Sequence, residues 1–155
     1  MASTTTRPTS RKGFALLKLV WVGPLTIIVA VLVNLVIRTI AVTFFGVPDG
    51  FTYLQAPFVI GSTVVFLLLA LVAFILVGRF ARRPVRFYRM LALVALFVSF
   101  LNPVLALVGL FPAPGMNLHI FWTMIVMHMV SALIAVSMLT TLAVERSRSL
   151  AADTL

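Results

Sequence analysis

Four long apolar runs limit what this chain can fold into. Each has the length of about 20 mostly apolar residues that an α-helix needs to cross a bilayer. They cover Pro24 (or already Leu19) to about Phe45, 57–77, 90–111 and 118–144. The chain is 63% hydrophobic and only 10% charged, with a mean hydropathy of +1.22, whereas soluble domains carry about 25% charged residues. The sequence therefore predicts an all-α bundle of four transmembrane helices, in a multi-pass membrane protein.

Residues with known positional preferences mark several ends of the runs. Pro24 and Pro57 suit the first turn of a helix, where a missing N–H costs no hydrogen bond. Asn117 is a suitable N-cap for the fourth helix. Gly78 is a suitable stop for the second.

The cationic residues are placed at alternate ends of the runs. Apart from Arg38, every Lys and Arg lies before the first run, between the second and third, or after the fourth. The connecting segments 46–56 and 112–117 contain neither. The positive-inside rule then predicts that both termini and the arginine-rich segment are cytoplasmic. The net charge of +9 is explained by this topology, so no nucleic-acid partner is expected.

Three segments follow from this pattern. Residues 1–13 are polar and are predicted to be disordered, residues 14–144 form the transmembrane domain, and residues 145–155 form a short cytoplasmic tail. The first apolar run is too long for the apolar region of a cleavable signal peptide, and no small-x-small site follows it, so a retained anchor is expected.

The segment RFARRPVRFYR between the second and third runs is unusually cationic. It contains Arg79, Arg82, Arg83, Arg86 and Arg89. Near an anionic leaflet each contributes about 1 kcal/mol of attraction. The arginines are candidates for binding a lipid headgroup, and the simpler alternative is topology and interfacial anchoring. In both cases membrane lipids are the expected partners.

Polar side chains inside three of the runs form the candidate binding site. Asn34 and Arg38 lie in the first run, Asn102 in the third and His128 in the fourth. At ~1.5 Å per helical residue all four lie roughly 10–16 Å from the outer ends of their helices. A shared depth predicts one polar pocket near the bilayer centre. The alternatives are ordinary interhelical hydrogen bonds for the amides and a snorkelling side chain for Arg38.

Charge and helix shape bear on this pocket. No run contains Asp or Glu, and Asp49 is the only carboxylate in the outer connecting segments. An intramembrane charge indicates a functional site, and Arg38 therefore suggests an anionic ligand. Pro103 directly follows Asn102 and is expected to kink the third helix and free a carbonyl there.

The third run also has a stripe of small and polar residues at steps of three and four. The stripe consists of Ala92, Ala95, Ser99, Asn102, Ala106 and Gly109. Such stripes let helix backbones approach closely in lipid. We therefore expect this face to be buried in the bundle.

Four short stretches resemble a known family. NLVIR (34–38), RPVRFYR (83–89), SFLNP (99–103) and MHMVSAL (127–133) resemble a family of small bacterial four-helix integral membrane proteins, catalogued only as a domain of unknown function. The resemblance covers roughly residues 16–144. It implies the four-span fold and a bacterial plasma (inner) membrane, and it transfers no chemistry.

An enzyme is the class that the residues support least. The runs offer no carboxylate pair, the chain has no cysteine, and His119 and His128 lie at different depths, so neither a metal nor a cofactor is expected. A non-catalytic accessory or structural component of a membrane complex, or a homo-oligomer, is favoured. The alternative is a small transporter or binder of an anionic small molecule or lipid.

Overall fold

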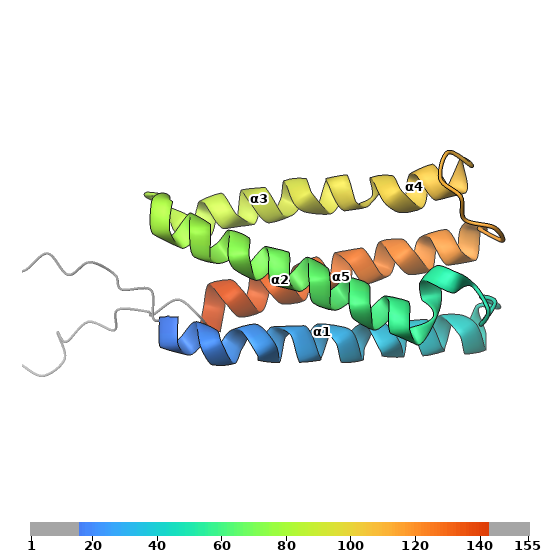
Figure 1. Ribbon diagram of the computed structural model, residues 1–155, viewed down its shortest axis with the longest axis horizontal. Helices are drawn as coiled ribbons and strands as arrows, with labels where there is room; N and C mark the ends of the chain where they lie inside the picture. Colours follow the sequence, from blue (N-terminus) through green and yellow to red (C-terminus); the bar gives the residue numbers. More distant parts are fainter. Residues whose placement is uncertain (1–15, 143–155) are drawn as a thin grey trace, which may run out of the picture.

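The computed structural model describes residues 16–142, and this part of the chain is a bundle of four long antiparallel helical segments (Figure 1). All four are long and apolar enough to cross a membrane, which confirms the predicted all-α fold. The predicted disordered segment 1–13 and tail 145–155 lie outside the described residues. The elements are α1 Leu16–Phe44, η1 Thr52–Leu54, α2 Ala56–Phe80, α3 Pro84–Ser99, α4 Leu101–Leu107 and α5 Leu118–Leu142.

The helices pack in a ring in which each segment contacts the next. α1 packs on α2 and α5, α2 packs on α3, and both α3 and α4 pack on α5. The start of α1, the end of α5 and the α2–α3 turn lie at one end of the bundle, hereafter the arginine end (Figure 1). The connecting segments 45–55 and 108–117 lie at the opposite end, hereafter the loop end. This arrangement is the one that the predicted topology requires, and the cytoplasmic side itself stays a prediction.

At the arginine end the helices extend further than predicted. Pro24 lies inside α1 and not in its first turn. α2 continues past Gly78 to Phe80, and α3 begins at Pro84 rather than at residue 90. Counting apolar residues misses these turns because charged side chains do not prevent helical backbone hydrogen bonding. Most of the arginine segment is therefore helical, with only three residues between α2 and α3.

Two predicted helix starts are confirmed. Pro57 lies in the first turn of α2, where its lack of an N–H is harmless. Asn117 caps α5, because its Oδ1 accepts a hydrogen bond from the Ile120 N–H at 2.9 Å. This cap fixes where the last helix enters the membrane, and thereby the height of the side chains along it.

Apolar packing is concentrated in three clusters along the bundle. The loop-end cluster includes Leu54 and Ile120, the central one Ala30 and Ala135, and the arginine-end one Phe74. Small residues bring α1 close to its neighbours. At Gly23 a Cβ atom would lie 2.9 Å from Leu71 Cδ2, so a larger residue there would require the Leu71 side chain to move.

Candidate functional site: an intramembrane polar cavity

A buried amide lies between the apolar clusters, halfway along the bundle. The Asn34 side chain donates from Nδ2 to Thr63 Oγ1 at 2.9 Å and to Ser131 Oγ at 2.8 Å. Asn34 is only 4% exposed, and its Oδ1 has no hydrogen-bond partner within residues 16–142. The Asn34 amide therefore joins three helices through its Nδ2, while its Oδ1 accepts no hydrogen bond from the described residues.

This amide forms part of the wall of a cavity of ≈ 270 Å³. All the helices and η1 contribute to its lining. The polar lining residues are Asn34, Tyr53, Ser62, Thr63, Tyr88, Ser99, Asn102, His128 and Ser131. Among the lining residues of the described chain there is no Lys, Arg, Asp or Glu. The cavity thus offers hydrogen-bonding groups without a formal charge, set among apolar side chains.

The break in the third span shapes one wall of the cavity. α3 ends at Ser99 and α4 begins at Leu101, with Phe100 between them (Figure 1). Pro103 has no N–H, so the Ser99 carbonyl loses the donor it would have four residues later. Ser99 and Asn102 both line the cavity. The break in the third helix that Pro103 was expected to cause is therefore present, and it lies beside the cavity.

The small stripe of the third span faces this cavity, but it does not bring helix backbones together along its length. Ala92, Ala95, Ser99 and Asn102 all line the cavity, and Ala95 and Asn102 are exposed. Of the stripe, only Ala106 is buried, at 8% exposed. The expectation of a buried face was therefore wrong for its middle part. The small side chains leave space there because α2 and α5 do not close over them.

Of the four residues predicted to share a pocket, the structure brings three together. Asn34, Asn102 and His128 line the same cavity, from α1, α4 and α5. The His128 ring lies edge-on against Phe100, with ring centroids 6.5 Å apart, so the imidazole is held beside the α3–α4 break. Arg38 is not among the lining residues.

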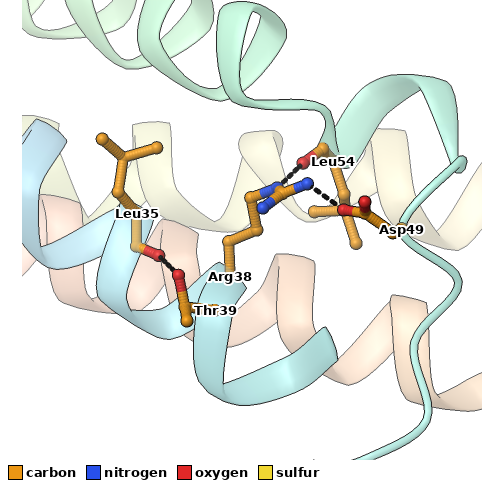
Figure 2. Close-up of polar contacts among 5 residues, drawn as sticks. All are labelled: Leu35, Arg38, Thr39, Asp49 and Leu54. Atoms are coloured by element: carbon orange, nitrogen blue, oxygen red, sulfur yellow. Dashed lines mark hydrogen bonds and ion pairs between the residues drawn. The ribbon is translucent and has the colours of Figure 1, made fainter. Parts of the chain in front are cut away.

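Arg38 instead binds the segment that follows α1 (Figure 2). Its Nε donates to the Leu54 carbonyl at 2.6 Å, and its Nη2 pairs with Asp49 Oδ1. The Arg38 side chain is 20% exposed and that of Asp49 72%. The guanidinium is one turn nearer the loop end than Asn34, and its long stem turns it toward that end. It meets the carboxylate there rather than a ligand in the bundle.

Two tyrosines lie at opposite ends of the cavity lining. Tyr53 in η1 donates to the Pro112 carbonyl at 3.2 Å, which links the two connecting segments at the loop end. Tyr88 is 2% exposed and packs edge-on against Phe74 near the arginine end. Sequence reasoning did not include Tyr88 among the pocket residues. Its spacing of four residues before Ala92, on the same helix face as the stripe, was the signal that it points inward.

The open side of the cavity lies between α2 and the α3–α4 segment. Most of the exposed lining residues come from these helices: Phe58, Ser62 and Phe66 on α2, with Ala95 and Asn102 opposite; Tyr53 in η1 is also exposed. α2 diverges from α4 toward the loop end (Figure 1). In a bilayer the exposed lining residues on α2 and the α3–α4 segment would face lipid, which gives the cavity a lateral opening.

Only part of the arginine segment surrounds a second hollow, at the arginine end. Arg82, Arg83 and Arg86 line it, whereas Arg79 and Arg89 do not. Of the five predicted headgroup residues, three thus line one space and two do not.

A comparison with family models matches residues 15–145 to a family described as "Family of unknown function (DUF6069)". The chain belongs to this family. A search of curated proteins and a search of solved structures each gave no match. Membership in this family assigns no chemistry, so the function has to be inferred from the cavity itself.

Proposed function

We propose that this integral membrane protein is non-catalytic and binds a small, uncharged, membrane-dissolved molecule in the polar cavity. The observation that supports this best is the unused acceptor on Asn34. A buried polar atom without a partner costs about 1–3 kcal/mol, and Asn34 Oδ1 is such an atom, on a residue that lines the cavity. A ligand with a hydroxyl or amide N–H directed at Oδ1 would remove that cost.

The lining favours an uncharged ligand over the anion that the sequence suggested. The anionic alternative depended on Arg38, and that guanidinium is engaged by Asp49 and the Leu54 carbonyl. Hydroxyl and amide groups in the lining can bind a neutral polar group without desolvating a charge. At ≈ 270 Å³ the cavity is smaller than the ~300–1,000 Å³ of typical drug-sized sites. The ligand, or the part of it that enters, is correspondingly small.

A binding role also explains why the cavity is open to one side. The exposed lining residues on α2 and α3–α4 give a route between helices, which suits a molecule that partitions into lipid. The polar groups that the described residues place in the lining are hydroxyls, amides and one imidazole, which suits hydrogen bonding to a neutral polar group. Binding, storage or transfer of the molecule is the role we infer.

The test is the set of molecules that accompany the purified protein. Ala95→Leu fills the cavity without removing a hydrogen bond, while Val94→Phe adds bulk at a neighbouring position that is 59% exposed and does not line the cavity. Both variants and the wild type would be purified in mild detergent, extracted with solvent and analysed by mass spectrometry. We expect one small neutral compound that is present in the wild type and Val94→Phe and lost in Ala95→Leu. Identical extracts from all three, as a cavity holding only water would give, would contradict the proposal.

A second candidate, an accessory or structural component of a membrane complex or homo-oligomer, is favoured by the third span. Only 11% of its apolar window is buried in the bundle, against 22–28% in the other three. A partner helix would find its largest free surface there. Native mass spectrometry of the same preparations separates the two candidates, because a stoichiometric protein partner or a defined oligomer supports the second, and a monomer with a small molecule supports the first.

A further inference from the structure

The hollow at the arginine end is larger than the polar cavity and chemically different from it. It is a wide depression of ≈ 710 Å³, more open than the polar cavity. Arg82, Arg83 and Arg86 line it together with apolar side chains that include Leu76, Phe80 and Met90, and its lining surface is mostly apolar. We call it the arginine hollow.

The three guanidinium groups have no anion from the described chain to bind. Within residues 16–142 the only carboxylate is Asp49, which lies at the loop end and is paired with Arg38. Clustered arginines without acidic neighbours attract anions, and the planar guanidinium fork matches a phosphate with two parallel hydrogen bonds.

The start of α3 adds to this preference. Arg83 is the N-cap residue and makes no side-chain capping bond. The first intrahelical hydrogen bond of α3 is Phe87 N–H to Arg83 O, so the N–H groups of Val85 and Arg86 have no acceptor within the helix. Free N–H groups and the positive end of the helix dipole favour an anion at this position.

The apolar part of the hollow distinguishes a lipid from a free anion. Leu76 is 51%, Phe80 77% and Met90 61% exposed, and all three line the same hollow as the arginines. Their surface continues along α2 and α3 into the membrane-spanning part. We propose that the arginine hollow binds one anionic phospholipid of the adjoining leaflet. Arg82, Arg83 and Arg86 hold its phosphate, and an acyl chain lies along Leu76, Phe80 and Met90.

The chain itself supplies a matched control for this site. Arg82→Gln/Arg86→Gln removes two charges from the hollow, and Arg79→Gln/Arg89→Gln removes two charges from the same segment outside it. Each protein, in mild detergent, would be titrated with phosphatidylglycerol or phosphatidylcholine, and the bound lipids counted by native mass spectrometry. An arginine near an anionic surface contributes about fivefold in affinity, so we expect the first pair to weaken phosphatidylglycerol binding about thirtyfold. The second pair should weaken it by less than about threefold, because only long-range attraction is lost.

Further measurements distinguish a lipid site from a site for free phosphate and from diffuse electrostatic attraction. Inorganic phosphate at ~10 mM should leave the bound phosphatidylglycerol in place; its displacement would show a site for free phosphate and overturn the lipid assignment. Equal losses in the two double variants, or equal binding of the two lipids by the wild type, would show diffuse attraction and overturn the site. If Arg82→Gln/Arg86→Gln does not fold, as judged by circular dichroism, Arg82→Lys/Arg86→Lys replaces it, with Arg79→Lys/Arg89→Lys as control. The lysine pair in the hollow keeps its charge but loses bidentate contacts, so only that pair should weaken binding.

Discussion

Removing the Arg38 guanidinium should destabilise the protein far more than removing the charge of its partner, Asp49. Arg38 makes two contacts with the segment after α1, one to the Leu54 carbonyl at 2.6 Å and one to Asp49 (Figure 2). The two partners differ in their surroundings. Leu54 is 1% exposed, whereas the Asp49 side chain is 72% exposed. The perturbations to compare are Arg38→Met, which keeps most of the side-chain length, and Asp49→Asn, which keeps the shape.

These surroundings decide the magnitudes. A hydrogen bond from a charged donor is worth about 1.5–3 kcal/mol, and its loss leaves the carbonyl of a buried residue without that donor. An exposed ion pair is worth only about 0.2–1 kcal/mol, and the amide oxygen that Asp49→Asn introduces could still accept from Nη2. We therefore expect Arg38→Met to cost about 2–3 kcal/mol and Asp49→Asn less than about 1 kcal/mol. The double variant should resemble Arg38→Met alone, because the Asp49 contact has then already been lost.

Thermal unfolding in detergent, followed by circular dichroism, measures this difference. About 2–4 °C per kcal/mol for a chain of this size gives a shift on the order of 5–10 °C for Arg38→Met. Thr39→Val is the control, because the Thr39 hydroxyl bonds only the Leu35 carbonyl of its own helix, at 2.9 Å (Figure 2). Equal shifts for Arg38→Met and Asp49→Asn would refute the reasoning, since the exposed ion pair and not the Leu54 contact would then hold η1.

Two further predictions concern packing and topology. Ala106 is 8% exposed and Leu105 is 39% exposed. Ala106→Leu should therefore cost about 1–3 kcal/mol of stability by overpacking, whereas Leu105→Phe should keep a melting temperature near that of the wild type. Equal shifts in melting temperature for the two variants would show that the inward face of α4 is misassigned. Because the chain has no cysteine, single cysteines that replace Ser10, Gly50 or Ala151 can be labelled with a membrane-impermeant thiol reagent in intact cells. We expect labelling at position 50 alone. Labelling at position 10 or 151 instead would reverse the predicted orientation.

Much of the polar cavity could be predicted because depth and helix face are local properties. A residue's height in a span follows from counting along the helix, and its face follows from the 3.6-residue period. Asn34, Asn102 and His128 were placed at one level in this way, and they do line one cavity. The inward direction of Ala92, Ala95 and Ser99 followed from the same period.

The sequence by itself determined the class of protein and the four spans. Hydropathy summed over about 20 residues depends on no neighbour, and a spanning helix satisfies its own backbone in lipid. The kink near Asn102 was equally local, because Pro103 lacks a donor in any surroundings.

Only the tertiary structure decided how these helices meet. Whether the stripe of small residues on α3 closes against a neighbour or leaves a space depends on the tilt of every helix at once. Arg38 lies one helical turn from Asn34, yet its side chain does not line the cavity. The segment after α1 folds back and offers it Asp49 and the Leu54 carbonyl as partners. The division of the five arginines into three that line the hollow and two that do not was set by where α2 ends and α3 begins. These features depend on contacts between residues that are far apart in the chain, and a local sequence pattern does not predict such contacts.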